Sequence, residues 1–240
     1  MATAVPFSPV PPVPPREMRE VVTPSQIYLQ PIAAPSILGL YGFAGATFMV
    51  AANMAGWFGG ARTDLYLAPF AALFGGVAQF SAGMWGFKAR DGVATAMHGM
   101  WGAFWIAFGL LQLAFLHGSL VEPVGAFPAM GYWFIVLGAI TWMGMIGAMA
   151  ENSALTLVLG FLAAGSTTAA VAYLIGMHAL IVLAGYFFII SAILAWYVAS
   201  ALMLESAFKR PVWAVGKTKR ARMEPQLVPG SGEPGVIHGQ

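Results

Sequence analysis

Residues 152–204 read NSALTLVLGFLAAGSTTAAVAYLIGMHALIVLAGYFFIISAILAWYVASALML, an unbroken run without a single Asp, Glu, Lys or Arg. A helix needs about 20 apolar residues to cross the hydrocarbon core of a bilayer. This run is long enough for two such helices, and we place the turn between them at Gly176-Met177-His178. Because every backbone amide in lipid must find its partner within the protein, both spans are predicted to be helical, near 154–175 and 180–203.

The same absence of charge recurs toward the N-terminus. Four more charge-free gaps predict helices over 37–58, 66–87, 93–116 and 130–150. Only 8% of the 240 residues are charged and 59% are hydrophobic, whereas a soluble domain carries roughly a quarter charged residues. The sequence also lacks the alternating strands of about 10 residues that are typical of a transmembrane barrel. It therefore predicts an all-α membrane protein, with a bundle of six transmembrane helices over residues 35–204.

The basic residues predict the orientation of this bundle. Six spans place the N-terminal segment, the 88–92 loop, the 151–153 turn and the C-terminal tail on one side of the membrane. Of the 11 basic residues, only Arg62 falls on the other side. The remaining ones are Arg16, Arg19, Lys88, Arg90, Lys209, Arg210, Lys217, Lys219, Arg220 and Arg222. Because Lys and Arg are enriched in cytoplasmic loops, both termini are predicted to be cytoplasmic, in a cell (inner) membrane.

The two ends of the chain differ from its middle. Residues 1–34 are rich in proline, which favours an extended cytoplasmic arm over a helix. Such an arm either docks onto a protein partner or lies as a tail on the surface, and we favour the tail. No basic segment followed by an apolar one marks a cleavable signal peptide. The tail, 205–240, is basic as far as Arg222, where we expect contact with the lipid bilayer, and is then rich in Pro and Gly.

The predicted spans hold little that an enzyme needs. The sequence has no cysteine, and its histidines are not spaced as ligand pairs: His98, His117, His178 and His238. No Gly-rich phosphate loop and no basic-aromatic stripe for nucleic acid is present. We therefore predict no enzyme, no cofactor, no metal and no nucleic-acid partner. His98 lies within a predicted span, where we favour a hydrogen-bonded packing residue over a proton-linked pore residue.

Four short motifs carry a more specific signal. Residues 34–43 read APSILGLYGF, residues 75–85 read GGVAQFSAGMW, residues 101–105 read WGAFW and residues 184–186 read AGY. In this order they resemble the acetate uptake transporter family, the acetate/succinate permeases of bacteria and fungi, whose signature is Asn-Pro-Ala-Pro-Leu-Gly-Leu. The resemblance covers roughly residues 34–216 and agrees with the number of spans.

The resemblance implies a fold, a function and a set of site residues. The family's six-helix bundle assembles into a homo-oligomer, a hexameric ring with one pore per protomer. Its members pass small monocarboxylates such as acetate, and in some cases dicarboxylates such as succinate, either coupled to protons or driven by the solutes' own gradient. The family's pore constriction of Phe, Tyr and Leu is expected at Phe43, Trp101 and Leu162. Substrate-binding positions are expected at Pro35, Ser36, Leu38, Gly39, Thr47, Asn53 and Gln79.

The residues of the motif at 34–43 have physical properties that suit the passage of a carboxylic acid. Ser36 is a good N-cap after Pro35, so free amides and the positive end of the helix dipole would face the cytoplasmic mouth and attract a carboxylate. Beyond this mouth, the apolar side chains of the constriction would restrict passage by their size and by excluding water. A protonated acid would cross this constriction more readily than a bare carboxylate. Without the family, the residues alone favour an ordinary helix start and a packed Phe43.

The chain also departs from the family pattern. The replacements are Ala34 for the signature Asn, Ile37 for its second Pro, Gly86 for a Glu, Met100 for a Ser, Trp101 for the constriction Tyr, and Glu151-Asn152 where basic residues are common. Two functions therefore stay open. One is a transporter or channel for acetate-like acids. The other is a non-conducting structural or assembly membrane protein that keeps the fold and binds a partner complex.

Overall fold

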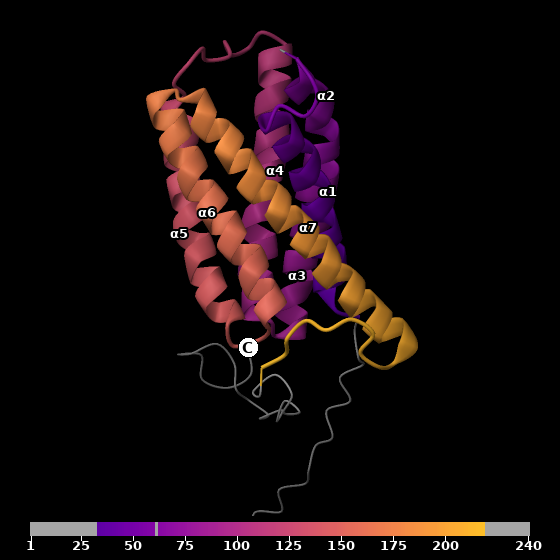
Figure 1. The fold of residues 1–240 in the computed structure, drawn as a ribbon. Coiled ribbons are helices and arrows are strands. Elements are labelled where there is room, and N and C mark those ends of the chain that lie inside the picture. Colours follow the sequence, from indigo (N-terminus) through magenta and orange to yellow (C-terminus); the bar gives the residue numbers. More distant parts are fainter. Residues whose placement is uncertain (1–32, 61, 219–240) are drawn as a thin grey trace, which may run out of the picture. The chain divides into compact units, whose positions relative to one another are not determined.

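The computed structural model describes residues 33–60 and 62–218, and no side chain is described for Asp64. Within these ranges the secondary structure is helical (Figure 1). The elements are α1 (Pro35–Met54), α2 (Thr63–Phe70), a π-helix η1 (Ala71–Ala78), α3 (Gln79–Ala89), α4 (Gly92–Leu116), α5 (Pro128–Ala148), α6 (Ser153–Ile175) and α7 (His178–Phe208). Apart from Ala33 and Ala34, the predicted N-terminal arm lies outside the described residues.

Six segments are long and apolar enough to cross a membrane, which confirms the predicted number of spans. Helices α2, η1 and α3 are continuous and together form the second span, Leu65–Ala89. The predicted turn at 176–178 is confirmed, because Gly176 ends α6 in the left-handed conformation (φ 68°) and α7 begins at His178. The largest differences are at α1, which ends at Met54 instead of 58, and at α7, which continues beyond 203 to Phe208.

The second span contains the one irregular helix of the described bundle. Pro69 has no N–H to donate to the carbonyl four residues earlier, and the wider turns of η1 begin two residues after it. Inside η1, a Cβ on Gly75 would lie 2.5 Å from Trp105 Cγ, and one on Gly76 would lie 2.7 Å from Ile106 Cγ1. The two glycines thus let the widened helix lie directly on α4, and η1 ends where the buried Gln79 begins α3.

The helices form a closed arrangement around a shared core. Helix α1 packs against η1 and α3 on one side and against α7 on the other, α7 packs against α6, and α6 against α5. Helix α4 joins α5 to η1 and α3, which closes the ring (Figure 1). The core is rich in aromatic rings, and many large apolar side chains also face outward, as expected of helices surrounded by lipid or by other subunits.

The chain turns back after α7 and packs against the turn between α5 and α6. Ser153 N and Ala154 N donate to the carbonyls of Gly216 and Val215, both at 3.1 Å. Trp213 stacks on Tyr197 with ring centroids 5.2 Å apart. We call residues 212–218 the C-terminal strap. The strap occupies the first amides of α6, which a helix cannot satisfy within itself.

Candidate solute pathway

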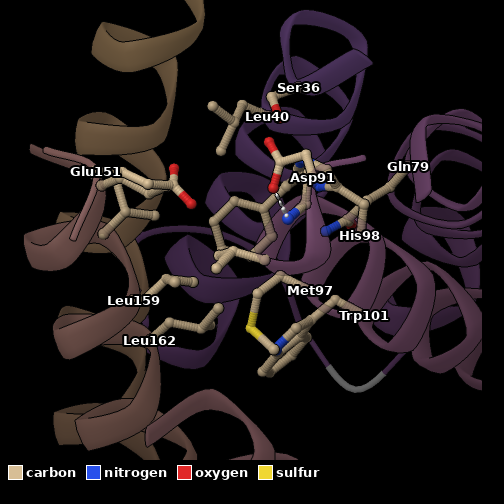
Figure 2. Close-up of a pocket in the computed structure, with 15 residues that line it drawn as sticks. Ser36, Leu40, Gln79, Asp91, Met97, His98, Trp101, Glu151, Leu159 and Leu162 are labelled. Atoms are coloured by element: carbon tan, nitrogen blue, oxygen red, sulfur yellow. Dashed lines mark hydrogen bonds between the residues drawn. The ribbon is translucent and has the colours of Figure 1, made fainter. Parts of the chain in front are cut away.

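The first turns of α1, α4 and α6 meet at a cavity of about 40 Å³, which we call the first cavity (Figure 2). Ser36, Asp91 and Glu151 stand at its upper rim in this view, and Trp101 and Leu162 lie at the opposite end. The complete lining is Ser36, Leu40, Phe43, Gln79, Asp91, Val93, Ala94, Met97, His98, Trp101, Glu151, Leu155, Val158, Leu159 and Leu162. The cavity is large enough by volume for a few waters.

The start of α1 differs from the predicted one. Ala34 is the N-cap, Pro35 occupies the first helical position, and Ser36 follows inside the helix, so the prediction of Ser36 as N-cap is wrong. Proline suits the first position because its φ is already helical and its missing N–H would have had no partner there. Ser36 nevertheless borders the first cavity, in the first turn of α1.

The other two helix starts are capped by side chains at the same cavity. Asp91 Oδ1 accepts a hydrogen bond from Ala94 N, and Asn152 Oδ1 accepts one from Leu155 N, each at 2.8 Å. Glu151 immediately precedes the second of these caps. Burial, and then the nearby Asp91 carboxylate, raise the pKa of Glu151 from its ordinary value of about 4.5 to about 7. Glu151 therefore exchanges its proton near neutral pH.

Two buried polar side chains lie deeper in the first cavity. Gln79 and His98 are 2% and 5% exposed, and among the described residues Gln79 Oε1 and His98 Nδ1 have no hydrogen-bond partner. The imidazole packs directly on α1, because a Cβ on Gly39 would lie 2.6 Å from its ring. A buried polar atom without a partner is costly, so both atoms mark places where a polar solute gains a hydrogen bond.

A second cavity, of about 30 Å³, lies on the other side of Trp101 and Leu162. It is lined by Thr47, Val50, Ala51, Met54, Trp101, Phe104, Trp105, Phe108, Met130, Phe134, Leu162, Tyr173 and Phe188. Here too, among the described residues, Thr47 Oγ1 and Trp105 Nε1 are buried without a hydrogen-bond partner. Both cavities therefore combine apolar walls with two such polar atoms.

The structure brings the three predicted constriction residues together between the two cavities. Trp101 and Leu162 line both cavities, and Phe43 lines the first and meets the Trp101 ring edge-on, with centroids 6.3 Å apart. All three are at most 2% exposed. Their position fits a constriction, and their effect on a passing solute stays a prediction.

The predicted substrate positions divide into two groups. Ser36, Gln79 and Thr47 line the cavities, and Gly39 makes room for the His98 ring. The others do not line either cavity. Pro35 and Leu38 line an outward groove, with Leu38 50% exposed. Asn53 Nδ2 donates to the carbonyl of Phe58 at 2.9 Å and closes the turn after α1.

Sequence reasoning did not assign a site role to Asp91, Trp105 or Glu151. A signal was present for Glu151, which is the one charged residue between positions 123 and 204. Asp91 gave a weaker signal, because an acidic residue before a helix is an ordinary cap. No signal was present for Trp105, because the sequence of an apolar span does not show which tryptophan has an indole N–H without a hydrogen-bond acceptor. Within the described part of the chain, no three His, Asp or Glu side chains gather closely enough to hold a metal ion.

Six membrane-length helices around two cavities that share Trp101 and Leu162 define an all-α membrane protein with a candidate solute pathway. Residues 20–215 match the GPR1/FUN34/yaaH family, and the chain belongs to this family.

Relatives and one solved structure agree with this assignment. An acetate transporter protein patA of Aspergillus clavatus is 27% identical over 199 residues, which cover 75% of this chain and 76% of that protein. A succinate-acetate/proton symporter SatP of Escherichia coli K12 is 25% identical over 187 residues, or 78% of this chain and 97% of that protein. The structure of the bacterial acetate channel SatP superimposes with a TM-score of 0.71 at 24% identity, over 78% of this chain and 100% of that one. The family is thus one of acetate transporters and channels, not of enzymes.

Proposed function

We propose that this protein conducts small monocarboxylic acids of the size of acetate, together with a proton, across a cell (inner) membrane. The observation that carries the proposal is the pair of cavities divided by Phe43, Trp101 and Leu162. The functions for which the two relatives are named support this class of substrate, and succinate is the larger candidate. The family resemblance further supports a homo-hexamer with one pore per protomer.

The lining favours the protonated acid over its anion. Crossing an apolar wall strips a carboxylate of hydration that the wall cannot replace, and the neutral acid loses far less. A protonated carboxyl group can donate to Gln79 Oε1, or to His98 Nδ1 when Nε2 carries the imidazole proton. Beyond the constriction, its carbonyl oxygen can accept from the Thr47 hydroxyl or the Trp105 indole. A proton would then cross with each acid.

The even number of spans places both termini on the same side of the membrane, and the basic residues indicate which side this is. The start of α1, the end of α7 and the turns after α3 and α5 lie at the same end of the described bundle (Figure 1). Of the described basic residues, Lys88, Arg90, Lys209, Arg210 and Lys217 belong to this end and Arg62 to the other. The positive-inside rule favours a cytoplasmic location for this end, and hence for both termini and the first cavity.

The test is uptake of labelled acetate by proteoliposomes that contain the purified protein, with and without an inward proton gradient. We expect saturable uptake above empty vesicles, and more of it with the gradient. Succinate and lactate, measured in parallel, define the size limit. A well-folded protein that takes up none of the three acids would contradict the proposal and favour the non-conducting assembly protein, which stoichiometric foreign subunits after purification would support.

A further inference from the structure

The two carboxyl groups at the rim of the first cavity are unusual in a chain with so few charges. Asp91 caps the start of α4, and Glu151 precedes Asn152, the cap of α6, so the two groups come from opposite walls (Figure 2). Both line the cavity, and Figure 2 shows the two carboxyl groups turned toward each other across it. Two carboxylates that face each other across a partly buried space repel. A proton that binds to one of them neutralises its charge and removes the repulsion.

Their hydrogen bonds make the two groups unequal. Asp91 Oδ1 accepts from Ala94 N at 2.8 Å, at the positive end of the α4 dipole. No residue in the described part of the chain donates to the side chain of Glu151. Burial and the Asp91 charge raise the pKa of Glu151 to about 7. Of the two, Glu151 is therefore the group that takes up the proton.

Among the described residues, no Lys or Arg forms a salt bridge with Glu151, and Arg90, next to Asp91, is exposed. Helices α1, α5 and α6 contain no charged residue, and α4 contributes Asp91 at its cap and His98 deeper in the cavity. The C-terminal strap reaches Glu151 through its backbone, where Thr218 N donates to the Glu151 carbonyl at 3.0 Å. The ammonium of Lys217, in the same strap, pairs with Glu205 at 2.6 Å.

A second observation indicates that a polar solute enters this cavity. Gln79 and His98 lie behind the rim and line the same cavity, both are more than nine-tenths buried, and each carries an atom without a partner among the described residues. An acid that reached these atoms from the α1 end would pass between Asp91 and Glu151 (Figure 2).

We propose that Asp91 and Glu151 form a proton-binding pair, and that one proton on this pair admits a small monocarboxylate which the doubly charged pair repels. The proposal rests on the proposed function and adds its proton site. The step is a proton transfer: an O–H bond forms on the Glu151 carboxylate with a proton from the solvent at its side of the membrane. The bond breaks again when the proton returns to the same solvent or passes to the entering acid anion. This assigns the coupling to residues that the family signature does not contain.

Proton binding is tested first, without transport. The full chain in lipid is titrated by infrared difference spectroscopy, which follows the carbonyl band of protonated carboxyl groups. The wild type should show a carboxyl group that titrates near pH 7, as assigned to Glu151. Glu151→Gln should remove this transition. Asp91→Asn keeps an acceptor for the α4 cap and should move the transition to lower pH, because the neighbouring negative charge is gone.

Transport of the same variants is measured between about pH 6 and about pH 8, on either side of the Glu151 transition. Ionisation of acetate itself affects all variants equally, so the readout is the ratio of Glu151→Gln to wild-type uptake, after subtraction of empty vesicles. We expect this ratio to rise several-fold with pH. Glu122→Gln, which changes an exposed carboxyl group in the loop before α5, should match the wild type throughout.

The outcomes separate the two proposals. If the infrared transition survives in Glu151→Gln, or if the uptake ratio stays constant with pH, the proton-binding pair is overturned while the acid pathway stands. If the transition responds as expected and no preparation takes up acid, the proton site is supported and the acid pathway is overturned.

Discussion

The indole nitrogen of Trp101 donates a hydrogen bond to Thr141 Oγ1 at 3.0 Å, and Thr141 donates in turn to the carbonyl of Leu137 at 2.6 Å. Both side chains are buried; the first bond ties α4 to α5, and the second lies within α5 and orients the Thr141 hydroxyl. The ring that separates the two cavities is thus fixed in one orientation by a neighbour that lines neither cavity.

Replacing Thr141 by Val should loosen the Trp101 ring. The buried indole N–H would lose its acceptor, at a cost of about 1–3 kcal/mol, so we expect the melting temperature in detergent to fall by several degrees. Uptake of acids larger than acetate should rise relative to acetate. Thr141→Ser keeps the acceptor and is the matched control. Equal melting temperatures and selectivities for the two variants would show that this bond does not hold the ring.

Replacing Phe43 by Ala should widen the passage between the cavities. We expect uptake of propionate and butyrate to increase relative to acetate, because the side chain opposite Trp101 is removed. Phe48→Ala removes the same ring from the outward side of α1, where the residue is 39% exposed, and should leave selectivity unchanged. Phe43 is fully buried and its removal is expected to cost about 3–5 kcal/mol, so Phe43→Leu, a smaller change, is measured beside it. Unchanged selectivity in both Phe43 variants would place the constriction elsewhere.

Replacing Gly39 by Ala should displace the His98 ring. The added Cβ would lie 2.6 Å from the imidazole, whereas a Cβ on Gly99 would meet nothing within 4 Å. We expect Gly39→Ala to lower the free energy of unfolding by about 1–3 kcal/mol, and Gly99→Ala to be neutral or slightly stabilising. In the His98→Ala background, the cost of Gly39→Ala should largely vanish. A cost that is the same with and without the imidazole would show that the two residues are not coupled.

Ionisation of Glu151 should make the fold less stable as the pH rises. Its pKa is about 7 in the folded protein against an ordinary 4.5, so between these values the folded chain keeps a proton that the unfolded chain has lost. Stability is therefore lost as pH increases through this window and levels off above it. The check is the melting temperature of the wild type minus that of Glu151→Gln, which should decrease from about pH 4.5 to about pH 7. A difference that is flat or rises with pH would contradict the assignment.

The sequence alone predicts the spans well, because lipid excludes charge and the charge-free gaps mark where lipid lies. It does not predict η1. Pro69 and the two glycines at 75 and 76 are visible in the sequence, but the wide turns depend on how closely Trp105 and Ile106 approach. The C-terminal strap could not be predicted from a local sequence pattern either, because its hydrogen bonds join residues 153 and 154 to residues 215 and 216, which are far apart in the sequence.

The sequence predicts the constriction residues of the site better than its other residues, for a physical reason. Phe43, Trp101 and Leu162 were placed by resemblance, and the structure brings them together. Other positions of the same motif, such as Leu38, face outward instead, because a helix turns through about 100° per residue and neighbours in a motif cannot share one face. Glu151 stood out as a single charge in a long uncharged region, but only the fold shows that it faces Asp91.

The position of the strap has a consequence for the order in which the molecule is completed. The first amides of α6 receive their partners from Val215 and Gly216, more than sixty residues later in the chain. The start of α6, beside Glu151 at the first cavity, therefore receives these acceptors from nearly the last described residues to leave the ribosome. A chain truncated before residue 215 would leave the amides of Ser153 and Ala154 without these acceptors, whereas a tag attached after residue 218 would leave the hydrogen bonds in place.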